Sequence, residues 1–227
     1  MVPLHDNNPT RTTPLVVYAL IGVNIAVFLG EMSLSDRELR SFFHAWAIVP
    51  QELTASFSGS IASPVPEWLT LFTSQFLHGG ILHIAGNMLF LWIFGNNIED
   101  KLGHIKFLIF YLTCGALAGL SQWVFATDSS VPTLGASGAI AGVMGAYLIR
   151  FPRSQILTLV PLGPIWTTVR LPAFAFLVFW FVQQAISSIA TLGIEMEGGG
   201  VAYWAHAGGF VFGAILGPLM GVFDDRQ

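Results

Sequence analysis

The chain has 227 residues, of which 54% are hydrophobic and only 10% are charged. A soluble domain usually carries about 25% charged residues, so this composition excludes an ordinary soluble fold and favours a protein with several membrane spans. With 9 basic and 13 acidic residues, the chain also lacks the clustered positive charge that nucleic-acid binding requires. The single cysteine, Cys114, excludes disulfide frameworks and thiolate metal cages, and we interpret it as an inert packing residue.

Six weakly charged stretches are long enough to cross the roughly 30 Å hydrocarbon core of a bilayer as helices. We therefore predict an all-α membrane protein whose six-helix domain covers residues 14–223, between a short tail over 1–13 and another over 224–227. An apolar outer loop over 31–75 is expected to fold against the membrane surface. A secretory signal is the alternative for the first stretch, and the weak basic flank disfavours it. The predicted spans are 14–30, 76–95, 105–126, 134–149, 171–192 and 201–223.

The basic residues predict the orientation of these spans. Only Arg37 and Arg40 lie on the side opposite the termini, whereas the other basic residues lie on the side of the termini. The positive-inside rule then places both termini in the cytoplasm, and for so compact a chain we expect a bacterial inner membrane. On that side, residues 151–170 include three prolines, which break helices, so we predict an irregular connector there.

Polar side chains are costly inside a bilayer, so the few that lie in the predicted spans mark functional candidates. No Asp or Glu lies well inside a span, which argues against a proton- or cation-coupled transporter. Helical rise counted from the inner boundary places Ser137 and His83 at the same depth, about 20 Å in, and places His206 in the same outer third.

The fourth span is unusually short if its helix begins near Ser137, because residues 137–149 cover only about 20 Å of the core. We therefore predict a fourth helix whose outer end is sunk below the membrane surface. Non-helical backbone over residues 134–136 is tolerated at that depth only where it lines a polar cavity, so water must reach it from outside.

Small residues recur on one face of the fourth and of the sixth span. Such stripes allow two helix backbones to approach closely, which would bring Ser137 within reach of His206. The stripes are Ser137, Ala141 and Gly145 on the fourth span, and Gly209, Gly213 and Gly217 on the sixth.

These polar residues have a defined chemistry when they meet. A serine hydroxyl becomes a nucleophile when a histidine accepts its proton, so Ser137 and His206 form a candidate dyad without a carboxylate. His83 and Asn87 lie one turn apart on the second span and, with the Ser137 backbone N–H, are suited to hold an oxyanion. His78 is rotated away from that face at helical spacing and is a secondary candidate.

Three motifs around these residues resemble those of the rhomboid intramembrane serine proteases. Residues Gly135–Gly138 match the G-x-S-G signature, which makes Gly135 a further secondary candidate. Residues 83–87 are similar to the family's H-x-x-x-N, and residues 205–213 to its A-H-x-x-G-x-x-x-G. Each motif is weak alone, but three in order on the second, fourth and sixth spans are specific. The resemblance covers residues 15–223.

The resemblance implies a serine endopeptidase that cleaves transmembrane segments of other membrane proteins near their outer end. It implies water in an outward-facing cavity, contact with the lipid bilayer, and no metal or other cofactor. It also implies Ser137 as the nucleophile, His206 as the base, and His83, Asn87 and the Ser137 amide as the oxyanion site. The fifth span and the loop over 193–200 resemble the gate and cap of the family.

One departure from the family concerns the orientation of the base. Some relatives carry an aromatic residue one turn after the serine, where it packs on the histidine, whereas this chain has Ala141. The fifth span or Trp204 must then orient His206. We interpret Asn24, Gln183 and Gln184 as residues that bridge helices.

Other functions remain as alternatives. A three-histidine metal site is disfavoured because His78 faces elsewhere and no carboxylate or H-E-x-x-H motif joins it. A catalytically silent protein that binds membrane helices would normally have lost Ser137 or His206, and both are present. A channel or transporter is disfavoured because the chain lacks midplane carboxylates and paired broken helices. Ser137 in isolation would be an ordinary packing residue.

Overall fold

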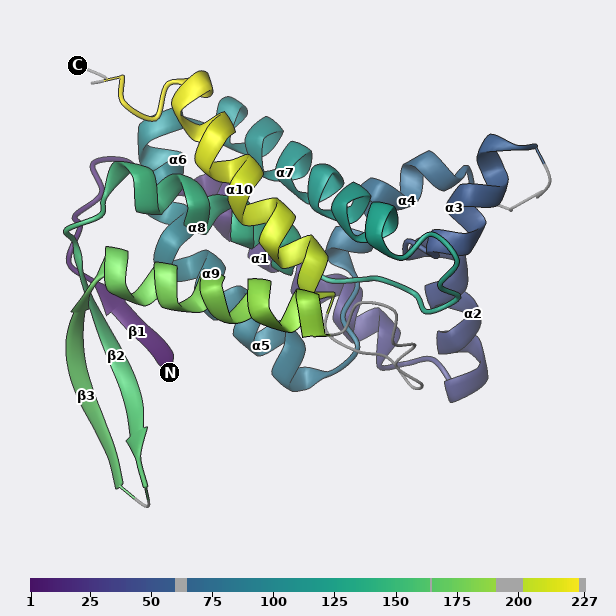
Figure 1. The fold of residues 1–227 in the computed structure, drawn as a ribbon, viewed down its shortest axis with the longest axis horizontal. Helices are drawn as coiled ribbons and strands as arrows, with labels where there is room; N and C mark the ends of the chain where they lie inside the picture. Colours follow the sequence, from purple (N-terminus) through teal and green to yellow (C-terminus); the bar gives the residue numbers. More distant parts are fainter. Residues whose placement is uncertain (60–64, 164, 191–201, 225–227) are drawn as a thin grey trace.

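The computed structural model describes residues 1–59, 65–163, 165–190 and 202–224. Its long helices lie side by side, with a small sheet at one end and short helices at the other (Figure 1). The strands are β1 (Val2–Asp6), β2 (Gln155–Leu162) and β3 (Ile165–Pro172). The helices are α1 (Leu15–Glu31), α2 (Asp36–Trp46), α3 (Pro50–Phe57), α4 (Glu67–Thr73), α5 (Ile81–Phe90), α6 (Asn96–Leu102), α7 (His104–Phe125), α8 (Ser137–Arg150), α9 (Ala173–Ala190) and α10 (Tyr203–Met220), with short helical turns η1 (Ser74–Phe76) and η2 (Leu91–Gly95).

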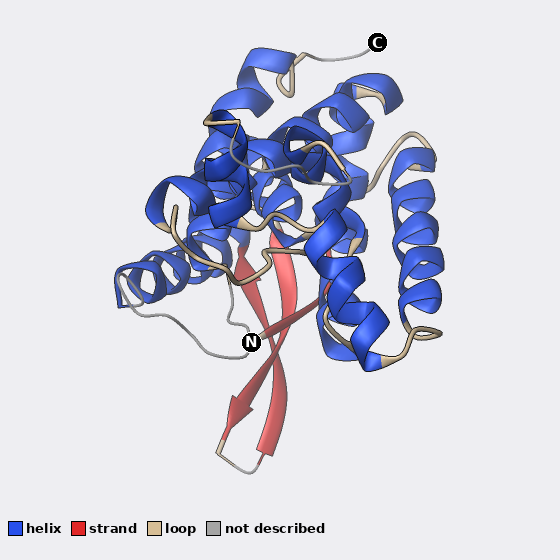
Figure 2. Ribbon diagram, turned by 90° about the vertical axis from the view of Figure 1, so that its right-hand side faces the viewer, coloured by secondary structure: helices blue, strands red, loops and turns tan. Residues whose placement is uncertain are grey.

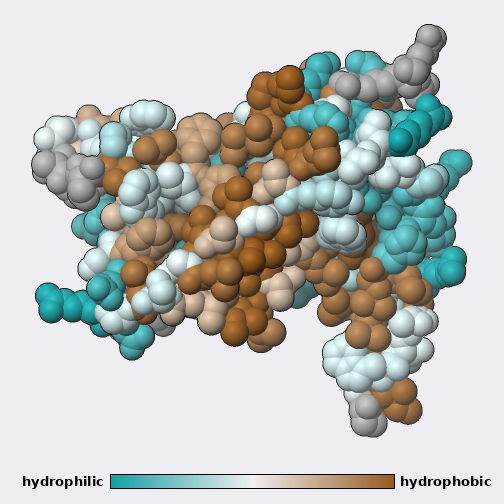
Figure 3. Space-filling view, turned by 180° about the vertical axis from the view of Figure 1, so that it is seen from behind, coloured by the Kyte–Doolittle hydropathy of each residue, from teal (hydrophilic) through white to brown (hydrophobic). Residues whose placement is uncertain are grey.

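The helical part has the character of a membrane protein. In the part of the chain that the structure describes, three segments are long and apolar enough to cross a membrane, namely Ile81–Leu102, His104–Phe125 and Ala173–Ala190, and α1 is a shorter apolar helix. Hydrophobic side chains gather over the middle of the molecule and hydrophilic ones at its ends (Figure 3). A helix lies at each predicted span, while the number of crossings and the sunken position of α8 stay predictions.

A three-stranded antiparallel sheet in the order β1-β2-β3 corrects the all-α prediction to a mostly helical fold. The predicted irregular connector is the β2–β3 hairpin, and the predicted tail supplies β1. Both hairpin strands are rich in β-branched residues, which favour extended backbone, and Gly163 adopts a φ of 62° in the turn. Pro161 is tolerated because it lies beyond Leu159, the last residue of β2 that pairs with β1.

The outer loop forms the short helices α2, α3 and α4. Ser35 and Glu38 make a capping box at the start of α2, in which the Glu38 carboxylate accepts the Ser35 N–H at 2.9 Å. Ile48 and Thr133 exchange two backbone hydrogen bonds of 3.0 and 2.7 Å. These bonds tie the loop to the segment that leads into α8.

Helices α8 and α10 pack backbone against backbone along a line of small residues, which we call the glycine seam. A β-carbon on Gly209, Gly213 or Gly217 of α10 would collide with α8, and in the first two cases it would meet a carbonyl oxygen. This close approach confirms the predicted packing of the two helices. The seam pairs Gly209 with Gly138, Gly213 with Gly142, and Gly217 with Ala146.

The predicted α8 stripe is confirmed in part, because Ser137 contacts His206 and a β-carbon on Gly145 would collide with the Phe210 carbonyl oxygen. Gly138 and Gly142, which were not predicted, contact α10 through their carbonyl oxygens. Because only glycine admits a backbone at this distance, the glycines occupy the contact and Ser137 is left at its edge. That position frees the Ser137 hydroxyl to face a side chain of α10.

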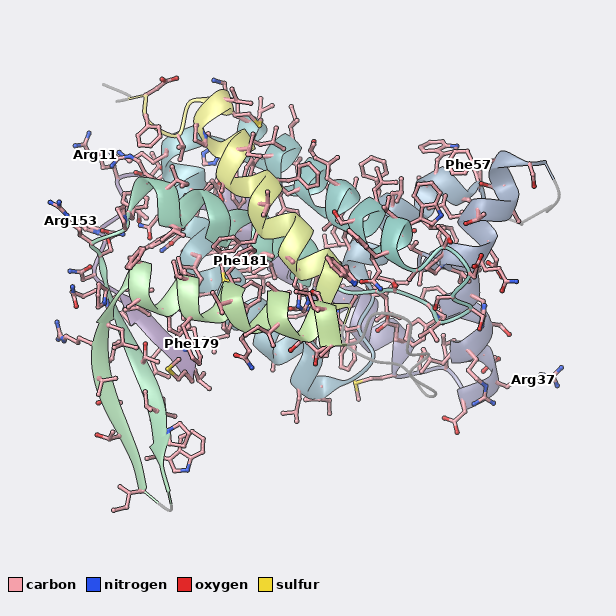
Figure 4. The ribbon with its side chains drawn as sticks, in the orientation of Figure 1. Arg11, Arg37, Phe57, Arg153, Phe179 and Phe181 are labelled. Atoms are coloured by element: carbon pink, nitrogen blue, oxygen red, sulfur yellow. The ribbon has the colours of Figure 1, made fainter. Side chains whose placement is uncertain are left out.

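We call the end of the bundle next to the sheet the inner end and the opposite end the outer end, after the predicted orientation. Buried carboxylates hold the inner end. Glu99 is fully buried and accepts the backbone N–H groups of Val16 and Val17 at 2.9 and 2.8 Å, so it caps the start of α1. Asp6 accepts the Tyr147 hydroxyl at 2.6 Å. Figure 4 shows Arg11 and Arg153 at this end and Arg37 at the opposite end, as the predicted orientation requires.

Candidate active site

Ser137 and His206 meet at the outer end of the glycine seam. Ser137 is the first residue of α8 and His206 lies in the first turn of α10. The Ser137 Oγ and the His206 Nε2 are 2.7 Å apart. The seam fixes this distance because it leaves the two helix backbones no room to slide apart or together, and the predicted pair is therefore brought into hydrogen-bond contact.

The second ring nitrogen of His206 contacts a glutamine of α9. The Gln184 Oε1 lies 2.8 Å from the His206 Nδ1, and only 8% of Gln184 is exposed. An amide oxygen can only accept, so with this pairing Nδ1 carries the hydrogen and the Nε2 lone pair faces Ser137. The ring of Trp180, one turn earlier on α9, lies 5.8 Å from the imidazole.

These contacts show which part of the chain orients the His206 ring, since Ala141 has no aromatic ring to pack on it. The fifth predicted span holds it, through α9, whereas Trp204 stacks on Phe125 at 3.8 Å. The interpretation of Gln184 as a residue that bridges helices was therefore incomplete: the bridge ends on the candidate base itself. The helical position of Gln184 could have revealed this contact, because Gln184 lies on the buried face of α9 with Leu177 and Ser188.

His83 and Asn87 lie against the loop that leads into Ser137. Gly135 in that loop has a φ of 121°, and its N–H donates to the Ser74 carbonyl at 2.8 Å. A β-carbon on Gly135 would lie 2.8 Å from the His83 Nε2 and 3.7 Å from the Asn87 Nδ2. Glycine is thus required here both by its backbone angle and by the two side chains that lie over it.

The position of His78 corrects its prediction. Helix α5 begins only at Ile81, so helical spacing does not apply and His78 is not turned away from the site. Its ring lies 5.1 Å from that of His83, and its Nε2 is 2.9 Å from the Asn87 Nδ2. Glu31, at the end of α1 and 3% exposed, accepts the His78 backbone N–H and was missed by sequence reasoning.

A large cavity of about 1620 Å³ is lined by both candidate pairs, Ser137 with His206 and His83 with Asn87, whereas His78, Gly135 and Gln184 are not among its lining residues. It exceeds the roughly 300–1,000 Å³ of an ordinary small-molecule pocket, so it has room for an extended polypeptide segment. Its wall on the outer side is the segment from Val124 to Leu134. The predicted cap over 193–200 lies outside the described residues. The polar side chains at its floor include His83, Asn87, Ser137 and His206.

The arrangement is a hydroxyl nucleophile, an oriented neutral base and a group of hydrogen-bond donors. Ser137 is the first residue of α8, so its N–H has no partner within the helix. Asn87 has two amide hydrogens, and His78 engages only one of them. The site therefore has the parts that acyl transfer through a serine ester requires.

The fold and the site together place this chain in a class of helical membrane proteins that hold a serine–histidine pair inside the bundle. The family model described as "Rhomboid domain" matches residues 65–223. The chain belongs to the rhomboid family, as its motifs indicate, and it is an integral membrane protein.

Curated relatives come from mitochondria and from bacteria. "Rhomboid protein 1, mitochondrial" of Saccharomyces cerevisiae is 30% identical over 93% of this chain and 55% of its own length. "Rhomboid protease GluP" of Bacillus subtilis is 36% identical over 70% of this chain and 28% of its own. Human "Presenilin-associated rhomboid-like protein, mitochondrial" is 31% identical over 63% and 35%.

These relatives bear on two further points. The chain spans about half or less of the length of each of these three proteins. Two of the three are mitochondrial, so they do not support the predicted bacterial inner membrane over another membrane.

Proposed function

We propose that this chain is an intramembrane serine endopeptidase that cleaves transmembrane segments of other proteins near their outer end. The observation that carries the proposal is the 2.7 Å contact between the Ser137 Oγ and the His206 Nε2 at the floor of a cavity large enough for a peptide. The match to a named rhomboid protease supports it. The basic residues support termini on the inner side.

Acylation follows from the positions of the two groups. The Ser137 Oγ attacks the carbonyl carbon of the scissile bond while its proton moves to the His206 Nε2. The protonated imidazole then gives that proton to the leaving amine as the carbon–nitrogen bond breaks, which leaves an ester on Ser137. A water molecule from the cavity repeats the sequence, with His206 again accepting the proton, and releases the acid.

Gln184 orients the base, and the hydrogen-bond donors near Gly135 stabilise the oxyanion. Gln184 holds the imidazole in the tautomer that presents a lone pair to Ser137, and it does so without a negative charge. The Ser137 N–H, Asn87 and His83 supply donors for the oxyanion that develops on the substrate carbonyl. His78 fixes the Asn87 amide, so that its second hydrogen is available in the cavity.

The substrate must unfold locally before it can react. In an intact helix each carbonyl oxygen accepts a backbone N–H, which hides the bond from attack. The small residues around Ser137 favour small side chains at the cleavage point, with helix-destabilising residues nearby. We expect stable poly-leucine spans to be cut much more slowly than such substrates.

The test is cleavage of a single-span reporter in liposomes by the wild type, Ser137→Ala and His206→Ala, together with labelling by a fluorophosphonate. Removal of either group should lower cleavage by about 10³-fold or more, and Ser137→Ala should also abolish labelling. The matched control is Ser56→Ala, because Ser56 donates to the Leu53 carbonyl within α3 and does not line the cavity. A folded wild type that neither labels nor cuts any reporter would favour the helix-binding alternative.

A further inference from the structure

The β2–β3 hairpin projects sideways from the inner end of the bundle. Its strands run across the direction of α9 and extend beyond the helices (Figure 1), and a view turned by 90° shows the same projection (Figure 2). The hairpin follows α8 and leads into α9, which begins at Ala173 and is long and apolar enough to span the membrane. The hairpin therefore leaves the bundle in the plane of the membrane surface, next to the leaflet on the side of the termini.

One face of this hairpin is mostly aliphatic from its base to its tip, with Thr158 and Thr167 as its two polar residues. The register pairs Ile156 with Leu171 and Thr158 with Val169 on this face, and Ile165 lies on it near the turn. Ile156 and Thr158 are fully buried against the rest of the protein. Farther out, Val169 is 36% exposed and Ile165 is 67% exposed, so the same face continues past the helices without protein to cover it.

The opposite face is more polar near the bundle. It carries Arg170 and Thr168 on β3, which pair with Leu157 and Leu159 of β2. At the tip this face carries Pro161 and Trp166, so the tip is apolar on both sides. A sheet with one apolar face, lying level with a membrane surface, has the form of an interfacial element.

The charge of this segment selects its partner. Residues 150–172 contain Arg150, Arg153 and Arg170 and no acidic residue. Phosphate headgroups of anionic lipids attract such clusters of basic residues. A mostly apolar face that continues the membrane-spanning part, in a segment whose only charged residues are arginines, complements a lipid surface better than an acidic or a purely apolar protein partner.

We propose that the hairpin is a membrane-surface anchor whose face with Val169 and Ile165 lies on the lipids of the leaflet next to the termini. Arg153 and Arg170 then lie at headgroup level. The anchor is distinct from the cavity at the outer end, and its existence does not depend on proteolytic activity. It fixes the rotation of α9 relative to the membrane surface, because β3 runs directly into that helix.

The experiment uses three variants of the intact protein, each of which carries a single spin label on β3. Val169→Cys and Ile165→Cys report the apolar face, and Thr168→Cys is the matched control on the opposite face. A Cys114→Ala background leaves a single target thiol in each variant. Accessibility to oxygen, which partitions into lipid, is compared with accessibility to a water-soluble nickel chelate, in liposomes of phosphatidylcholine with and without phosphatidylglycerol.

We expect the oxygen-to-nickel ratio to be several-fold higher at positions 169 and 165 than at 168, and to rise further with phosphatidylglycerol. Equal ratios at the three positions would overturn the proposal, because the face would then be in water. Dipolar coupling between labels on different chains, combined with low oxygen access, would also overturn the proposal. The face would then be covered by a second copy of the chain and not by lipid. Cleavage by the unlabelled wild type is measured in parallel, so loss of the proposed function is distinguished from loss of the anchor.

Discussion

The two ends of the helical bundle use polar residues in opposite ways. At the inner end, the Glu99 carboxylate is fully buried and accepts two backbone N–H groups of α1, while Asp6 accepts the Tyr147 hydroxyl. At the outer end, Ser137 and His206 contact each other and face a large cavity. Saturated polar groups hold elements together, whereas groups that keep unused donors and lone pairs beside a cavity are able to react. Substitutions at the two ends should therefore separate activity from stability.

The largest effect short of removing Ser137 or His206 is expected at the proposed oxyanion donors. Asn87→Ala should lower kcat by about 10²- to 10³-fold, because a donor to the developing charge is lost, with little change in KM. Asn24→Ala is the matched control, since Asn24 donates to the Leu20 carbonyl within α1 and does not line the cavity. Steady-state kinetics on the single-span reporter check this. Equal losses in the two variants would show that Asn87 acts only through packing.

A smaller effect is expected at the positioning glutamine. Gln184→Leu should lower kcat/KM by about 10- to 100-fold, because the imidazole loses the acceptor that fixes its tautomer and orientation. Gln184→Glu keeps an acceptor oxygen and should recover part of the activity. Gln183→Leu is the control, because the neighbouring Gln183 is exposed. If Gln184→Leu retained full activity, the contact with His206 would have no catalytic role.

The glycine seam links the two ends and should affect both properties. Gly213→Ala places a β-carbon against the Gly142 carbonyl, so we expect a loss of about 1–3 kcal/mol in the free energy of unfolding, together with reduced activity. Gly22→Ala in α1 meets nothing within 4 Å and should be neutral or stabilise by up to about 1 kcal/mol. Thermal unfolding in detergent and reporter cleavage measure the pair. A stable, fully active Gly213→Ala would contradict the tight seam.

The smallest effect is expected at the inner end, and it depends on pH. Burial is the main cause that raises the pKa of Asp6 above its ordinary value of 3.8, and the Tyr147 hydrogen bond partly opposes it. A folded-state pKa above the unfolded one means that the ionised form disfavours folding. The wild type should therefore gain stability, relative to Asp6→Asn, as the pH falls through the raised pKa toward 3.8.

The difference in Tm between the wild type and Asp6→Asn, followed across that pH range, checks this prediction. The difference should amount to a few degrees and should vary with pH, while activity per folded molecule stays unchanged. A difference independent of pH would show that Asp6 keeps its ordinary ionisation in the folded protein.

The sequence predicted the site better than it predicted the inner end, for physical reasons. Ser137 and His206 are polar residues in apolar helices, and glycines beside them recur at helical spacing, so their meeting was predictable. Gln184 was misjudged because a single helix does not reveal what its buried amide contacts. The hairpin was missed because its prolines, read as helix breakers, outweighed the alternation of Ile156, Thr158 and Val160.

The glycine seam has a consequence for how the family can diverge. An ordinary hydrophobic core tolerates compensating substitutions, in which a larger side chain at one position is matched by a smaller one at its neighbour. Between α8 and α10 there are almost no side chains to exchange, since the contacts run from glycine to backbone oxygen. That route is closed at these contacts, so we expect sequence change to fall on the inner sheet and on the lipid-facing surfaces instead. The geometry of Ser137 and His206 can therefore persist while the surroundings that choose substrates and membranes change.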